Sequence, residues 1–137
     1  MKDKIKLIST DFNDVLLFET ASYKDDRGNF KEAFNKEISE LTNVNFIQDN
    51  ESYSKYGVLR GLHFQKSPLE QSKLVRVIEG EIQDVVVDIR KKSNTYLKYV
   101  SVILNETNKR QLFIPKGFAH GFLVLSGHAI IAYKVDN

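Results

Sequence analysis

Short runs of β-branched and aromatic residues recur along the chain, and turn-forming residues separate them. Many short runs with turn signals between them are typical of an all-β sandwich or barrel. The intervening segments are too short for the crossover helices that a parallel α/β fold needs. The expected strands are residues 15–18, 46–52, 58–64, 73–79, 82–89, 99–104, 111–114, 122–125 and 129–133.

One short helix is expected at residues 35–41. The side chain of Asn35 can accept hydrogen bonds from the amide groups of its first turn, as residues of this type do at helix starts. We expect this helix to be a surface element.

The strand at residues 73–78 alternates so that Lys73 shares one face with Val75 and Val77. A lysine among valines either points into a cavity or, on an edge or outward face, reaches water. Periodicity alone favours the outward position, so a more specific signal is needed to place Lys73.

Composition indicates one domain and one site. With 137 residues, of which 42% are hydrophobic, the chain can build one core, so we expect a single domain over residues 1–137. A formal net charge of +2 does not favour nucleic acid or an anionic membrane as a partner. No apolar run resembles a signal peptide or a membrane span, so we expect a soluble, cytoplasmic protein. Cysteine is absent, which leaves His, Asp and Glu as metal ligands.

Two segments, residues 57–65 and 114–122, resemble the two motifs of the cupin superfamily. In the first a glycine lies six positions before His63, and in the second a Pro-x-Gly-x-x-His pattern ends at His120. Metal-binding cupins continue the first motif as His-x-His, whereas this chain has Gln65. Two imidazoles make a poor catalytic metal site, which usually has three protein ligands. The resemblance implies a jelly-roll barrel (double-stranded β-helix), and we expect no metal and no other cofactor, with Gln65 bonded to the substrate or a neighbouring strand.

Several blocks resemble one cupin branch more closely, the dTDP-4-dehydrorhamnose 3,5-epimerases. They occur in the same order as in that family and cover nearly the whole chain, which is far more specific than one short motif. The resemblance implies an epimerase that inverts C3, C5 or both of a 4-keto-6-deoxyhexose in a nucleotide-diphospho-sugar. It also implies a homodimer whose subunits contribute to each other's sites. The matching blocks are residues 26–28, 46–50, 60–65, 71–76, 84–90, 114–122 and 133–134.

The resemblance further implies roles for individual residues. His63 would be the general base and Tyr133 the general acid on the opposite side of the sugar, while Lys73 would lie near the C4 oxygen. The residues that would line the cavity or bind the sugar or its nucleotide diphosphate are Arg27, Glu32, Gln48, Asn50, Arg60 and His120.

These residue types suit the reaction. Removing a proton next to the C4 ketone develops negative charge on the ketone oxygen, so the site needs a base and a cation or donor. Histidine accepts protons near neutral pH because its ordinary pKa is about 6.5. A lysine stabilises the enolate oxygen, a tyrosine can deliver the new proton to the other face, and the planar fork of arginine suits a diphosphate.

Other interpretations of the same residues stay open. Considered without the matching blocks, His63 is better explained as a packed core histidine and Tyr133 as an aromatic core residue. The matching blocks favour the catalytic interpretation for both. For His120 the alternative is a structural histidine that bonds backbone at its turn. A second function is a sugar-nucleotide 3,4-ketoisomerase, although that group has a second histidine where Gln65 stands. A third is a non-catalytic sugar-nucleotide-binding cupin, which is disfavoured because Lys73 and the proton-transfer pair are present.

The C-terminal end departs from the family pattern. The family continues past the Tyr-Lys block and supplies an aromatic residue that stacks on the base and an aspartate that bonds the catalytic histidine, whereas this sequence ends at Asn137. Three explanations follow: an incomplete gene product, a substitute carboxylate such as Asp84 or Glu70, or a changed reaction. Asp84 is the first candidate partner of His63, because a carboxylate buried in a barrel strand needs a partner.

Two expectations concern geometry. Strict alternation would put Arg60 and His63 on opposite faces of their strand, but a bulge at Gly61 would turn both side chains inward. Asp88, in a strand otherwise rich in valine, either pairs with an arginine such as Arg90 or faces solvent.

Overall fold

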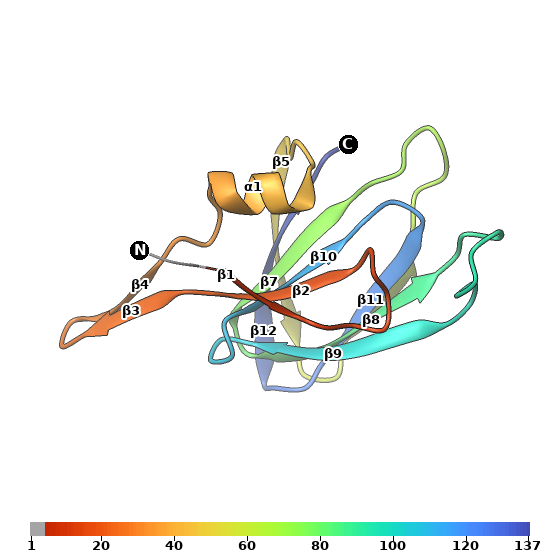
Figure 1. Ribbon diagram of the computed structural model, residues 1–137. Helices are drawn as coiled ribbons and strands as arrows, with labels where there is room; N and C mark the ends of the chain where they lie inside the picture. The colour runs from red at the N-terminus through yellow and green to blue at the C-terminus, as the bar shows by residue number, and fades with distance from the viewer. Residues whose placement is uncertain (1–4) are drawn as a thin grey trace.

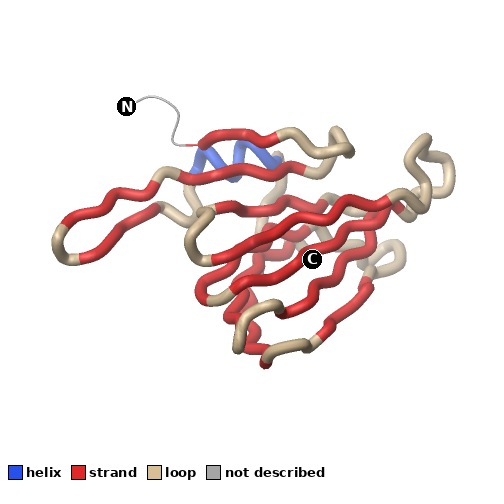
Figure 2. The backbone as a smooth tube through the Cα atoms, turned by 90° about the horizontal axis from the view of Figure 1, so that it is seen from below, coloured by secondary structure: helices blue, strands red, loops and turns tan. Residues whose placement is uncertain are grey.

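The structure is a computed structural model that describes residues 5–137, and it consists of two facing antiparallel sheets with a projecting hairpin (Figures 1 and 2). The strands are β1 (Ile5–Ile8), β2 (Leu16–Thr20), β3 (Ser22–Asp25), β4 (Gly28–Lys31), β5 (Gln48–Lys55), β6 (Leu59–His63), β7 (Lys73–Glu79), β8 (Glu81–Asp88), β9 (Tyr99–Asn105), β10 (Arg110–Ile114), β11 (Phe118–Val124) and β12 (His128–Val135). The larger sheet has the order β1-β2-β10-β7-β12-β5, and the smaller has the order β6-β11-β8-β9. The all-β prediction is confirmed.

Each expected strand overlaps a strand of the structure, and β7 matches its expected range at both ends. Three strands were not expected: β1, β3 and β4. Each has only four residues and no regular alternation of buried and exposed side chains, so the sequence carries no period-2 signal there. Strand β11 begins at Phe118, earlier than expected, because it follows the Pro-Lys-Gly turn directly.

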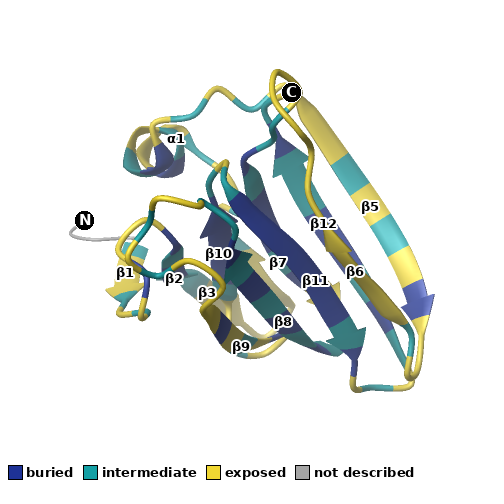
Figure 3. Ribbon diagram, turned by 90° about the vertical axis from the view of Figure 1, so that its right-hand side faces the viewer, coloured by how far each residue is buried: buried dark blue, intermediate teal, exposed yellow. Residues whose placement is uncertain are grey.

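The space between the sheets holds the main core, to which both sheets contribute side chains such as Leu112, Ile131 and Val86. The inward faces of β7, β8, β11 and β12 are the buried part of the barrel, while β5 and β6 are largely exposed (Figure 3). The barrel is therefore closed by core packing in its middle and open to solvent near β5 and β6.

The helix α1 (Lys36–Thr42) confirms the expected surface helix. The Oδ1 atom of Asn35 accepts a hydrogen bond from the backbone amide of Ile38 at 3.0 Å, which is the expected cap. Ile38 is fully buried and packs against Leu74 and Phe113 on the outer face of the larger sheet. Around Leu74 and Val75, one face of β7 is therefore covered by the barrel core and the other by α1, whereas Ile78 further along is 40% exposed.

The β3–β4 hairpin extends away from the barrel (Figure 1). Its apolar side chains Tyr23 and Phe30 are 43% and 65% exposed, so the barrel of the same chain does not cover them. Among residues 5–137, no helix has the length and apolar character that crossing a membrane requires.

Candidate active site

A cavity of about 200 Å³ lies between the two sheets, and five strands contribute to its lining. Val75, Phe122 and Ile131 supply apolar surface, and β5, β6, β7, β11 and β12 each supply at least one polar side chain. The polar side chains are Ser52, Arg60, His63, Lys73, His120 and Tyr133.

His63 and Tyr133 reach this cavity from opposite sheets, since β6 belongs to the smaller sheet and β12 to the larger one. His63 is exposed and Tyr133 is half-buried. Within residues 5–137, neither side chain makes a hydrogen bond, so both polar ends are available to a bound molecule.

A bulge in β6 turns Arg60 and His63 toward the same cavity, as predicted. His63 pairs with His120 and Arg60 pairs with Phe122, so three steps along β6 match two steps along β11. The extra residue lies next to Gly61, whose φ of +116° is unfavourable for residues with a side chain. The Nε atom of Arg60 then donates a hydrogen bond to the Oγ atom of Ser54 at 2.8 Å.

Lys73 points into the cavity, so the outward position that periodicity favoured is wrong. The alternation along β7 carries no information about solvent, because α1 covers the outer face and the core covers the inner one. Burial lowers the pKa of Lys73 below its ordinary value, while the negative charge of Asp84 opposes this shift.

Asp84 is fully buried, but its partner is His120 rather than His63. Its Oδ2 atom lies 2.8 Å from the Nε2 atom of His120, and the predicted contact with His63 is therefore corrected. The strand order explains the difference, because β11 lies between β8 and β6. The alternative that His120 bonds only backbone is also wrong.

A second cavity of about 570 Å³ adjoins the first and shares His63, Lys73 and His120 with it. Gln65 lines this second cavity and makes no hydrogen bond within the described chain, so its expected contact with a neighbouring strand is absent there. Arg90 also lines this second cavity.

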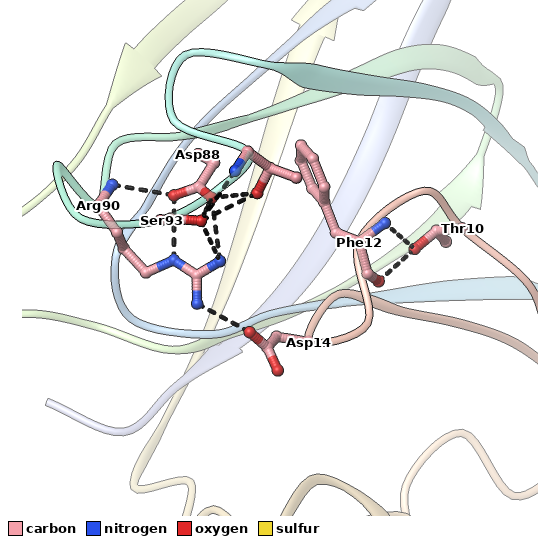
Figure 4. Close-up of polar contacts among 7 residues, drawn as sticks. Thr10, Phe12, Asp14, Asp88, Arg90 and Ser93 are labelled. Atoms are coloured by element: carbon pink, nitrogen blue, oxygen red, sulfur yellow. Dashed lines mark hydrogen bonds and ion pairs between the residues drawn. The ribbon is translucent and has the colours of Figure 1, made fainter.

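The buried Asp88 pairs with the half-buried Arg90, which was one of the two expectations for Asp88 (Figure 4). The guanidinium donates to both carboxylate oxygens of Asp88 at 3.0 Å and to Asp14 at 2.8 Å. These hydrogen bonds hold the pKa of Asp88 well below its ordinary value. The Cζ atom of Arg90 lies 4.6 Å from the ring centre of Phe118, which fixes this wall of the second cavity.

A protein-family model described as dTDP-4-dehydrorhamnose 3,5-epimerase matches residues 9–137. This chain belongs to that family. A family member from Shigella flexneri is 52% identical over 136 residues, which cover 97% of this chain and 75% of the relative. A member from Methanothermobacter thermautotrophicus is 50% identical over 133 residues, which cover 96% of this chain and 71% of the relative.

Solved structures of epimerases agree with the fold. The enzyme from Legionella pneumophila, solved with dTDP-4-keto-L-rhamnose, has a TM-score of 0.92 and 48% identity, and the match covers 97% of this chain and 72% of that one. The Bacillus anthracis enzyme, solved with TDP and PPi, has a TM-score of 0.92 and 50% identity, with 97% and 78% covered. The prediction of a cupin-type barrel from this epimerase family is confirmed.

Four residues that the resemblance assigned to the substrate do not line the cavity between the sheets. Gln48 and Asn50 lie on β5, beyond Ser52, and their side chains hydrogen-bond to each other at 2.9 Å. Arg27 lies at the tip of the β3–β4 hairpin and bonds Asp25. Glu32 follows β4 and accepts a hydrogen bond from the side chain of Asn35.

Sequence reasoning missed Ser52 and Ser54 on β5. Ser52 lines the cavity and its Oγ atom is buried with no hydrogen-bond partner in the described chain, while Ser54 holds Arg60. A period-2 signal was present, since Gln48, Asn50 and both serines occupy alternate positions. Among residues 5–137, no group of three His, Cys, Asp or Glu side chains is arranged to hold a metal ion.

Proposed function

We propose that this chain inverts C3, C5 or both of a 4-keto-6-deoxyhexose linked to a nucleoside diphosphate. The observation that carries the proposal is the meeting of His63, Lys73 and Tyr133 in one cavity from two opposite sheets. Residues 1–137 would act as one epimerase domain.

In this proposal His63 removes the proton from the carbon next to the C4 ketone. The electron pair of the broken C–H bond forms the C=C bond of the enolate, and the π electron pair of the carbonyl moves onto the ketone oxygen. Lys73 lies beside the same cavity and balances the negative charge on that oxygen. The hydroxyl of Tyr133 then gives its proton to the other face of the carbon, which inverts it. Proton exchange with solvent returns both side chains to their starting states.

The diphosphate would bind near Arg60, which Ser54 holds at the cavity edge. Guanidinium groups suit phosphate oxygens because they donate paired, charge-assisted hydrogen bonds. Gln48 and Asn50 continue the same row of β5 and would contact the sugar or the nucleotide. The relatives solved with a dTDP-sugar or with TDP support this class of substrate.

Solvent exchange tests the reaction. The protein is incubated in deuterated water with a dTDP-4-keto-6-deoxyhexose, and deuterium at C3 and C5 is followed by NMR. Incorporation with inversion is expected, and His63→Ala should abolish it. Tyr133→Phe should still exchange the proton but without inversion, because His63 can return a deuteron only to the face it deprotonated. Label at neither carbon would refute the proposal, and a 3-keto product would indicate a ketoisomerase instead.

We further propose that the chain works as a homodimer in which the β3–β4 hairpin completes the partner's site. The hairpin projects from its own barrel, exposes Tyr23 and Phe30, and presents Arg27 with a side chain that is 92% exposed (Figure 1). An exposed arginine on such an arm is suited to reach a phosphate in the neighbouring subunit.

A mixing experiment distinguishes the arrangement. Arg27→Ala and His63→Ala are each expected to be poorly active, but a mixed dimer of the two contains one site with both native residues if Arg27 acts on the partner's cavity. Co-expression of both variants should therefore restore up to half of the native activity per mixed dimer. If activity stays at the level of the separate variants, or if light scattering finds only monomers, the proposed arrangement is wrong.

A further inference from the structure

Asp84 is an unusual residue for the inside of a barrel. Its side chain is fully buried on the inward face of β8, between Ile82 and Val86. Only its Oδ2 atom has a partner, which is the ring of His120, and its Oδ1 atom has none among residues 5–137. A buried carboxylate oxygen without a donor costs stability, so its retention needs a reason.

The surroundings of Asp84 suggest that reason. Its strand belongs to the smaller sheet and β7 to the larger one, and its charge is the one that raises the pKa of Lys73 against the effect of burial. Without a nearby negative charge, a lysine in an enclosed site loses its proton more easily. The other charged or titratable side chains around Lys73 in the two cavities are Arg60, His63, Lys66, Glu70, Arg90, Lys91, His120 and Tyr133.

We infer that Asp84 is a positioning residue for the epimerase reaction: its hydrogen bond orients the ring of His120 in the cavity wall, and its buried negative charge holds the ammonium group of Lys73 at the same cavity. This inference rests on the proposed function. Asp84 itself does not touch the substrate, because its side chain is fully buried and does not line either cavity.

The geometry favours this role over a purely structural one. Asp88 lies on the same face of β8 and is an example of a structural carboxylate in this fold. It accepts hydrogen bonds from Arg90, Ser93 and Thr95. Asp84 lacks such a set of donors and instead bonds one residue of the cavity wall. A carboxylate kept for stability alone would be expected to have both oxygens satisfied.

The test compares Asp84→Asn with Asp88→Asn, two substitutions that each remove one buried charge from the same face of β8. Deuterium exchange into the sugar should fall by about 10- to 100-fold in Asp84→Asn, as for loss of part of an oxyanion-stabilising group. The alkaline limb of its pH–rate profile should move to lower pH, because Lys73 loses its proton more readily. Asp88→Asn should leave the alkaline limb in place, even if it lowers the melting temperature.

A second readout does not need turnover. The titration of Lys73 is followed by NMR of 13C-labelled lysine, with Lys73→Met used to assign the signal, and the His120 ring is followed by its 15N shifts. Asp84→Asn should shift the Lys73 titration to lower pH and change the tautomer of His120, whereas Asp84→Glu should keep the Lys73 titration close to that of the native protein.

The outcomes separate the two proposals. If the native protein shows no exchange into the sugar, the proposed function fails, but the titration of Lys73 still decides the role of Asp84. If Asp84→Asn leaves both the Lys73 titration and the His120 signals unchanged, the positioning role is overturned. Should Asp84→Asn fail to fold, Asp84→Glu decides through His120: its longer side chain displaces the carboxylate, so His120 ring signals identical to those of the native protein contradict the inference.

Discussion

Replacing Gly61 by alanine should damage both the stability and the activity of this epimerase, because the bulge in β6 depends on a residue without a side chain. A Cβ atom at this position would lie 2.7 Å from the Cα atom of Gly121 and 2.8 Å from the carbonyl oxygen of His120. Both neighbours are backbone atoms of the adjacent strand, so neither can move aside without shifting β11. The φ of +116° adds backbone strain for any residue with a Cβ atom.

The glycines of this chain allow the two costs to be separated. Gly57 has a φ of +76° with nothing within 4 Å of its Cβ position, and Gly127 has open space and no such φ. We expect Gly127→Ala to change the free energy of unfolding by less than about 0.5 kcal/mol. Gly57→Ala should lose about 1–2 kcal/mol from backbone strain alone. Gly61→Ala should lose that strain energy plus about 1–3 kcal/mol for overpacking, so about 2–5 kcal/mol in total.

Urea unfolding of the three variants measures these values, and solvent exchange into the sugar measures the consequence for the site. Gly61→Ala should lower kcat/KM by about 100-fold, since displacing catalytic groups by about 1 Å has effects of this size. Gly57→Ala is the matched control for strain, and it should keep near-native kinetics because Gly57 lies outside the cavity. Equal stabilities of Gly61→Ala and Gly57→Ala would refute the argument from close approach.

Three further predictions test individual side chains. Ser52→Ala should raise KM by about 2- to 10-fold with little change in kcat, as for loss of one neutral hydrogen bond. In the same steady-state kinetics, Ser52→Thr retains the hydroxyl and should keep KM closer to the native value. Lys73→Arg should move the alkaline limb of the pH–rate profile to higher pH while lowering kcat, because burial lowers the pKa of Lys73 whereas arginine stays charged. If the alkaline limb does not move, it reports the titration of another group. Asn35→Ala should reduce the free energy of unfolding by about 1 kcal/mol through loss of the cap, whereas Asn35→Asp should retain most of it in the same urea assay.

The strands of this barrel were predictable from sequence because most of them are runs of β-branched and aromatic residues bounded by turn-forming residues. In strand β8 buried and half-buried positions alternate along the whole length. The β3–β4 hairpin was missed for the opposite reason: it has no buried face in its own chain. A segment that packs on no core of its own chain leaves no period-2 pattern of buried and exposed residues.

Local geometry was also predictable where one residue type demands it. The conflict between Arg60 and His63 on one strand, together with Gly61 between them, was enough to predict the bulge. The partner of Asp84 was not predictable in the same way. Its burial follows from the valine-rich strand around it, but its partner depends on which strand lies next to β8, and strand order is a property of the whole sheet.

Lys73 shows how the same limit applies to a functional residue. Alternation distinguishes inside from outside only if one face of a strand meets water, and β7 meets the core on one side and α1 on the other. In such a strand, the face on which a polar residue lies does not indicate whether it reaches solvent. The presence of a polar residue is itself the informative signal. A charged side chain in a strand with two covered faces must end in a cavity or find a buried partner, since its burial is otherwise too costly. Applied to β7, this reasoning selects Lys73, which ends in the cavity. Arg76, on the α1 side, is only half-buried, so its guanidinium is not fully withdrawn from solvent.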